Sequence, residues 1–167
     1  MNDELKQTAT LLVSGLTKAG KTLSTAESCT GGLISEAITS VPGASKVFEL
    51  GLCVYSEVKK IKVLDIPPEI IAKYGAVSSE TVVSMAENAK RLASSDYAVT
   101  TSGVAGPDGG TEENPVGTVW IGWAYHGNSG CEKNIFSGTR DEIREKAALR
   151  AIEIITDIIN GVEYDKT

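Results

Sequence analysis

The order of helix-like and strand-like segments is the feature that most constrains the fold of this chain. Apolar residues recur at intervals of three and four over residues 3–18, and a short β-prone run, TLSTA, follows them. A second helical stripe begins at Leu33 and stops before Pro42. Because helices alternate with strands early and a hairpin follows late, the chain is predicted to form a three-layer α/β/α domain with a mixed β-sheet.

The later segments carry equally clear signals. Residues 79–93 place apolar side chains on one helical face, Leu92 among them, behind Ser78 or Ser79 as the N-cap. The last helix is predicted to open at a capping box, Thr139-x-x-Glu142. The other expected elements are strands within KVFELGLCVYS, a short helix at PPEIIAKYG, a buried strand at YAVTTSGVAG and a hairpin that turns at GNSG.

Composition narrows the class of protein. The 167 residues contain no linker and no repeat, which predicts a single domain over residues 1–167. A net charge of −6, with KKIK as the densest basic run, argues against nucleic acid as a partner. No apolar run approaches the roughly 18 residues of a membrane span, so no membrane partner is expected.

Other features indicate the compartment. The first ten residues lack a basic and an apolar signal region, so a cytoplasmic location is expected. Cys29, Cys53 and Cys131 are widely spaced and odd in number, which favours reduced thiols over disulfides or a zinc site.

The stretch TAESCTGG is the first of three segments that could carry chemistry. Ser28 stands among small neighbours at the mouth of a helix, where it could reach a substrate carbonyl. The backbone N–H groups of Thr30, Gly31 and Gly32 are expected to point outward without helical partners. Such donors can hold a phosphate or stabilise an oxyanion. Taken alone, the stretch also fits a plain capped turn.

The second segment is the glycine-rich stretch over residues 101–120, predicted to be a structured loop that lets backbone approach a ligand. It does not end in the Gly-Lys-Ser/Thr of a P-loop. Its acidic residues have no histidine partner, and therefore no metal is expected. The one histidine, His126, is expected at the surface of the hairpin.

The third segment is VYSEVKKIK, which offers a base for a serine nucleophile. With histidine nearly excluded, the remaining candidate is a lysine. A lysine serves as a base only if burial or neighbouring cations lower its pKa from about 10.4 toward roughly 7–8. Lys59 and Lys60 follow a strand, so one could point inward while the other is solvated, and both could be surface residues.

Six stretches, taken together, are similar to a known family. They are TAESCTGG, VYSEVKK, GAVSSETVVSMA, DYAVTTSGVAGPDGG, NPVGTVWIG and SGTRDEIR. In this order they resemble the CinA C-terminal domain family, whose stand-alone members are nicotinamide-mononucleotide amidohydrolases. The resemblance implies a Ser/Lys amidohydrolase of pyridine nucleotide salvage that needs no cofactor. Its small-molecule partner would be nicotinamide mononucleotide, and the protein would form a homo-oligomer.

The resemblance also implies roles for the catalytic residues. The nucleophile position falls on Ser28 and the general base on Lys60, although a slip of one residue would select Lys59. Tyr55 would lie beside the lysine, and Glu27 could orient it.

The substrate-binding positions follow in the same way. Gly31, Gly32 and Thr30 would supply oxyanion or substrate contacts. Arg140 is the candidate phosphate partner, since its fork suits a phosphate, with Arg144 or backbone N–H groups as the alternative. The positions implied for the nucleotide site are Ser102, Gly103 and Gly106. A binding or regulatory module that keeps this pocket without chemistry remains the competing hypothesis.

Overall fold

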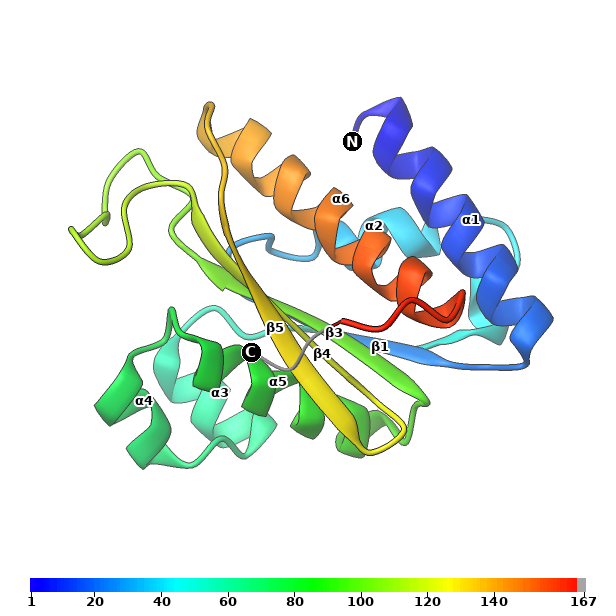
Figure 1. Cartoon of the computed structure of the whole chain (residues 1–167), viewed down its shortest axis with the longest axis horizontal. Coiled ribbons are helices and arrows are strands. Elements are labelled where there is room, and N and C mark those ends of the chain that lie inside the picture. Colours follow the sequence, from blue (N-terminus) through cyan, green and yellow to red (C-terminus); the bar gives the residue numbers. More distant parts are fainter. Residues whose placement is uncertain (165–167) are drawn as a thin grey trace.

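The predicted alternation of helices and strands is present in the computed structural model, which describes residues 1–164 (Figure 1). The last three residues of the expected domain, 165–167, lie outside the described residues. The elements are α1 (Asp3–Ala19), β1 (Leu23–Glu27), α2 (Leu33–Thr39), a 3₁₀ turn η1 (Ala44–Lys46), β2 (Phe48–Cys53), α3 (Glu57–Leu64), α4 (Pro68–Tyr74), α5 (Ser79–Ala93), β3 (Tyr97–Gly103), β4 (Thr118–Tyr125), β5 (Asn128–Ile135) and α6 (Arg140–Ile159).

The sheet is mixed, as predicted. Its strands lie in the order β2-β1-β3-β4-β5. The first three pair in parallel, whereas β3–β4 and β4–β5 pair in antiparallel fashion. The carboxyl ends of β1, β2 and β3 therefore meet at one edge, where α/β sheets commonly bind ligands.

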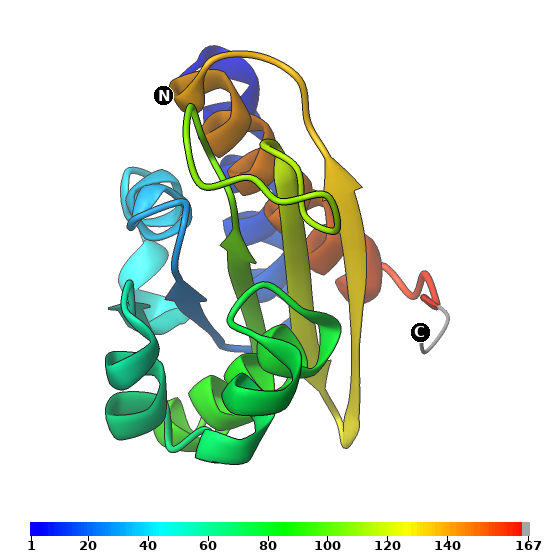
Figure 2. The ribbon, with the colours of Figure 1, turned by 90° about the vertical axis from the view of Figure 1, so that its left-hand side faces the viewer.

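Two helical layers cover the sheet (Figures 1 and 2). Helices α1, α2 and α6 pack together on one face, and α3, α4 and α5 lie on the other. Strand β1 is buried along its whole length and contributes to both layers. Leu23 joins the core under α1, α2 and α6, whereas Ala26 joins the core under α5. The prediction of a three-layer α/β/α architecture is confirmed.

Helix ends follow the predicted chemistry. Ser78 caps α5 by accepting a hydrogen bond from the Thr81 N–H. The capping box of α6 is complete, because the Thr139 hydroxyl accepts from the Glu142 N–H while the Glu142 carboxylate accepts from the Thr139 N–H. Residues 57–64, for which no helix boundaries were predicted, form α3 behind Ser56 as the N-cap.

Two local predictions are wrong. The hairpin turns at His126 and Gly127, with φ of 45° and 77°, and GNSG already begins β5 from its Asn128 onward. A two-residue turn with both φ values positive matches the twist of the flanking strands. Leu92 is 51% exposed, and Ala89 is the last buried residue of α5.

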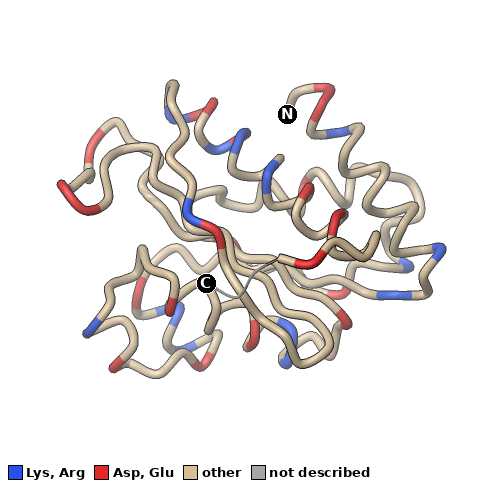
Figure 3. Tube along the Cα trace, viewed as in Figure 1, with Lys and Arg blue, Asp and Glu red and all other residues tan. Residues whose placement is uncertain are grey.

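Charged residues of both signs occur throughout the described chain. Figure 3 shows Lys and Arg mixed with Asp and Glu along the trace. No helix within residues 1–164 is both long enough and apolar enough to cross a membrane.

Candidate active site

Ser28 is the first residue after β1, at the carboxyl edge of the sheet. Its backbone N–H donates to the Thr101 carbonyl at 3.0 Å, which continues the pairing with β3. Side chains alternate along the extended chain, so Ser28 shares the α3–α5 face with Ala26. Cys29 lies on the opposite face, in the core under α1, α2 and α6. The strand thus directs the Ser28 hydroxyl toward Lys60 and places the Cys29 thiol in the opposite core.

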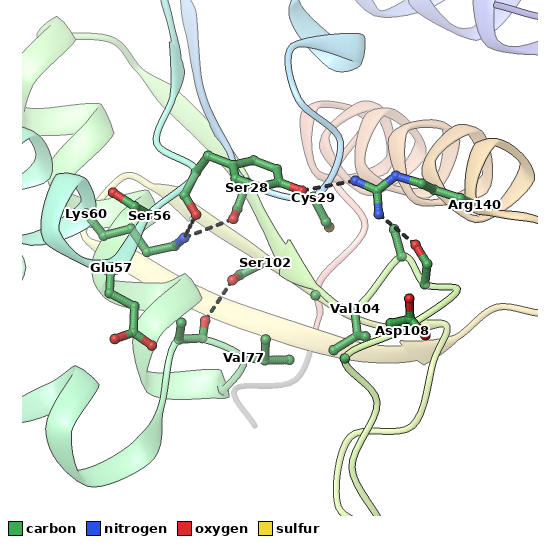
Figure 4. A pocket seen from close by; sticks show the side chains of 16 residues that line it. Ser28, Cys29, Ser56, Glu57, Lys60, Val77, Ser102, Val104, Asp108 and Arg140 are labelled. Carbon is green, nitrogen blue, oxygen red and sulfur yellow. Dashed lines mark hydrogen bonds between the residues drawn. The ribbon is translucent and has the colours of Figure 1, made fainter.

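Lys60 reaches Ser28 from α3. It shares the buried face of this helix with Leu64, one turn later, and only 1% of its surface is exposed. Its Nζ lies 2.9 Å from Ser28 Oγ, 3.0 Å from the Val54 carbonyl oxygen and 3.4 Å from the Tyr55 carbonyl oxygen (Figure 4). Lys59 is exposed. Of the two candidate lysines, the structure brings Lys60 to the serine.

The surroundings of Lys60 favour its neutral form. Burial lowers the pKa of the ammonium group below its ordinary value, while Cys29 and Glu57 act weakly in the opposite direction. No carboxylate within residues 1–164 forms a salt bridge with it. A neutral amine can donate its two hydrogens to the Val54 and Tyr55 carbonyls. Its lone pair is then directed at the Ser28 hydroxyl, which is the arrangement of a general base.

A cavity of about 420 Å³ opens beside this pair. Ser102, Gly103 and Gly106, the positions implied for a nucleotide site, line this cavity, and the Ser102 hydroxyl donates to the Ala76 carbonyl at 2.7 Å. The lining residues that were not named individually as site residues are Cys29, Ser56, Glu57, Ala76, Val77, Val104, Ala105, Asp108 and Gly109, the last four of which lie in the glycine-rich segment 101–120. Most of them follow β2 or β3 or precede α5, so proximity to strand ends was the signal that could have found them.

Arg140 lies across the cavity from Lys60 (Figure 4). Its Nη1 donates to the Gly106 carbonyl at 2.7 Å, and its Nη2 donates to the Tyr55 hydroxyl at 3.0 Å. Tyr55 was expected beside the lysine, but only its backbone carbonyl contacts Lys60. Its side chain is 63% exposed and extends toward Arg140, because the chain turns outward after β2.

Glu27 occupies a different place from the one expected. It is fully buried, and its carboxylate contacts the start of α2 instead of Lys60 or the cavity. Oε2 accepts from the Thr30 hydroxyl and from the N–H groups of Gly32 and Ile34. Oε1 accepts from the N–H and the hydroxyl of Ser35. An acid at the positive end of a helix is stabilising, and here it fixes the turn after Ser28.

The N–H groups of that turn also depart from expectation. Gly31 N–H donates to the Ser28 carbonyl and Gly32 N–H to Glu27, so neither is available to a ligand. The Thr30 hydroxyl is buried against Glu27 and Thr101. No oxygen atom within residues 1–164 accepts from the N–H groups of Cys29 and Thr30, and Thr30 is fully buried.

Cys29 and Arg144 also lie close to the Ser28 turn. Burial raises the pKa of the Cys29 thiol to about 11, so this thiol is protonated at neutral pH. Arg144, on α6, donates to the carbonyls of Cys29 and Thr30 instead of lining the cavity. No group of three histidine, cysteine, aspartate or glutamate side chains in the described chain is arranged to hold a metal ion.

Comparison with known proteins agrees with the fold. The model of the CinA C-terminal domain matches residues 5–159. The chain is 49% identical over 144 residues to a CinA-like protein of Petrotoga mobilis, covering 86% of this chain but 36% of that relative. It thus spans little more than a third of that longer protein.

A relative of similar length and two solved structures are also close. Nicotinamide-nucleotide amidohydrolase PncC of Escherichia coli K12 is 43% identical over 155 residues, which cover 92% of this chain and 94% of that protein. A CinA superfamily structure from Klebsiella pneumoniae has a TM-score of 0.92 at 30% identity, over 97% of this chain and 100% of that one. The structure of CihA from Agrobacterium tumefaciens has a TM-score of 0.92 at 33% identity, over 96% and 98% of the two chains. This chain therefore belongs to the CinA C-terminal domain family.

Proposed function

We propose that this protein is an amidohydrolase that converts nicotinamide mononucleotide to nicotinic acid mononucleotide and ammonia, with Ser28 and Lys60 as its catalytic pair. The observation that carries the proposal is the 2.9 Å contact between the buried Lys60 amine and the Ser28 hydroxyl. The choice of substrate rests on the similarity to the amidohydrolase of Escherichia coli.

The proposed reaction has two stages. Lys60 takes the hydroxyl proton as Ser28 Oγ bonds to the amide carbon, and the carbonyl oxygen becomes an oxyanion held by backbone N–H groups. The C–N bond then breaks, and the lysine returns the proton to the departing ammonia. In the second stage, water loses a proton to Lys60 and attacks the ester carbon. The acid is released, and Ser28 regains its hydroxyl.

The cavity suits a substrate of this class. Its volume of about 420 Å³ falls within the range of roughly 300–1,000 Å³ that is usual for small-molecule sites. Lys60 lies at one side for the carboxamide, and Arg140 lies at the other, where we propose that it binds the phosphate. Ser102, Gly103 and Gly106 would contact the nucleotide between them.

The test is turnover by the purified protein. Incubation with nicotinamide mononucleotide in a buffer containing a chelator should release ammonia and the acid nucleotide in equal amounts. Absence of release from pH 6 to pH 9 would contradict the proposal. Tight binding by calorimetry without release would instead indicate a nucleotide-binding module. Free nicotinamide serves as the matched control, since it carries the amide without the ribose phosphate.

Several expectations outside the site remain predictions. They are a single domain over residues 1–167, a cytoplasmic location, independence from nucleic acid and assembly into a homo-oligomer. The single continuous sheet supports the first. Sedimentation at several protein concentrations tests the last.

A further inference from the structure

Arg144 holds two consecutive carbonyl groups of the turn that follows Ser28. It lies on α6, more than a hundred residues away in sequence. Its Nε donates to the Cys29 carbonyl at 3.2 Å, and its Nη2 donates to the Thr30 carbonyl at 2.9 Å. The guanidinium is planar and can donate to two acceptors at once from fixed directions. An ammonium group has no such fixed geometry. The contact therefore fixes the orientation of two peptide planes.

The orientation of these planes determines where the N–H groups point. In a trans peptide the C=O and the N–H point in opposite directions. Arg144 draws the Cys29 carbonyl toward α6, so the N–H of the same peptide, which belongs to Thr30, is turned away from α6. Thr30 is fully buried and does not line the cavity, whereas Cys29, whose carbonyl Arg144 holds, does line it.

The other donors of the turn are already used. Ser28 N–H donates to Thr101, Gly31 N–H to Ser28 and Gly32 N–H to Glu27. Of the two N–H groups that remain, that of Cys29 belongs to a residue that lines the cavity, whereas Thr30 is fully buried. We infer that Arg144 is a positioning residue: by holding the Cys29 and Thr30 carbonyls it fixes the turn after Ser28, so that the N–H of the cavity-lining Cys29 stabilises the oxyanion formed when Ser28 attacks.

This inference rests on the proposed function and gives Arg144 a role distinct from that of Arg140. Arg144 would act on the transition state through the backbone, without touching substrate. Its loss should therefore lower kcat and leave KM almost unchanged. Loss of one oxyanion donor costs about 10²–10³-fold in kcat. Because Arg144 orients such a donor and does not supply it, we expect Arg144→Ala to lower kcat by about 10–100-fold.

The chain offers a matched control on the same helix. The Arg150 side chain is 29% exposed, against 30% for Arg144, and each pairs with an acid three residues away. Arg150 also binds β5, where it donates hydrogen bonds of 2.9 and 2.8 Å to the Glu132 carboxylate. Arg150→Ala should lose comparable stability in thermal unfolding but keep its kcat. Arg144→Lys should fall between Arg144→Ala and the wild type, and guanidinium ion should partly restore Arg144→Ala only.

A second readout needs no substrate. A fluorophosphonate probe phosphorylates an activated serine, and its phosphoryl oxygen occupies the oxyanion site. The rate of labelling at Ser28, followed by intact mass with Ser28→Ala as the blank, should fall about 10–100-fold in Arg144→Ala and stay unchanged in Arg150→Ala. Equal labelling in Arg144→Ala and the wild type, or a rise in KM without loss of kcat, would overturn the inference. A wild type that neither turns over nor labels would instead overturn the proposed function.

Discussion

At the scale of single residues, the alternation of side chains along the end of β1 separates two nucleophiles. Ser28 lies 2.9 Å from the Lys60 amine, while Cys29 packs in the core with a pKa raised to about 11. A thiol with so high a pKa holds little thiolate at neutral pH. Ser28→Ala should therefore lower kcat by on the order of 10⁴-fold. Cys29→Ala should cost some stability and little activity, as measured by ammonia release. Inactivation by a thiol reagent that substrate prevents would point to Cys29 instead.

Lys60 and Ser28 should act as one unit. Each has no function in the proposed chemistry without the other, so Lys60→Gln should be nearly as damaging as Ser28→Ala. The double variant should be no worse than either single variant. Lys59→Gln is the matched control, because that side chain is exposed on the same helix. Additive losses in the double variant would show that the two residues act independently.

The pKa of Lys60 should be visible in both activity and stability. Burial lowers this pKa below its ordinary value, so kcat/KM should rise with pH along a limb centred below about 10.4. Between the folded pKa and the ordinary value, the unfolded chain binds a proton that the folded protein does not. The free energy of unfolding therefore rises with pH between these two pKa values. Below the folded pKa, Lys60 is charged in both states, and the folded protein bears the full cost of burying that charge.

Urea unfolding can isolate this contribution. The wild type should gain stability relative to Lys60→Met as the pH rises toward 10, since only the wild type carries the group. A constant difference between the two proteins from pH 7 to pH 10 would mean that the pKa of Lys60 is not lowered.

The residue scale also shows where sequence reasoning reached its limit. The family resemblance gave the position of the base, but local spacing left Lys59 and Lys60 equivalent. The two lysines lie on different faces of α3. Lys60 is on the buried face, which it shares with Leu64, one helical turn later. Glu27 was misjudged because an acid next to a nucleophile suggests catalysis. Its actual partners, at the start of α2, depend on how the chain turns after β1.

At the scale of elements, the sequence predicted most helices and strands because their signals are local. Capping residues at Ser78 and Thr139 and the apolar stripes of α1 and α6 need no tertiary contact to be recognised. Helix α3 was harder, since its eight residues carry three lysines and only a short apolar face. The exact hairpin turn was missed because a non-glycine residue, His126, takes the first of two positive φ values.

The junction of β3 and β4 forms the floor of the cavity and offers an element-scale prediction. A Cβ at Gly103 would lie 2.8 Å from Val119 Cα and would collide with the Thr118 carbonyl oxygen. Because both contacts are backbone, Gly103→Ala should destabilise the fold by about 1–3 kcal/mol and should impair turnover.

Gly15→Ala is the matched control for this change. Its new Cβ would lie 3.8 Å from an Ile159 methyl group, an ordinary contact. Alanine is the better helix former, so this variant should gain up to about 1 kcal/mol. Denaturant unfolding measures both. A Gly103→Ala protein as stable and active as the wild type would show that the strands can separate without disturbing the site.

At the scale of the whole molecule, an anionic substrate must approach a protein with a net charge of −6. Local positive charge has to offset this field near the cavity. Burial lowers the pKa of Lys60, whereas the Arg140 guanidinium is a permanent cation among the residues that line the cavity. Arg140 also joins three distant segments: α6, the Gly106 loop and the residues after β2. Arg140 could therefore affect substrate binding through its charge or by holding the Gly106 loop in place.

Two substrates separate these effects. A guanidinium has five N–H donors, so the bonds to Gly106 and Tyr55 leave others for a phosphate. Hydrogen bonds to a charged group are worth about 1.5–3 kcal/mol. Arg140→Ala should thus raise KM for nicotinamide mononucleotide by roughly 10–100-fold and change KM for nicotinamide riboside, which lacks the phosphate, by far less. Tyr55→Phe removes one anchor of the guanidinium without its charge and should give a smaller rise. If Arg140→Ala weakens both substrates equally, its role is to hold the Gly106 loop, and the phosphate is bound elsewhere.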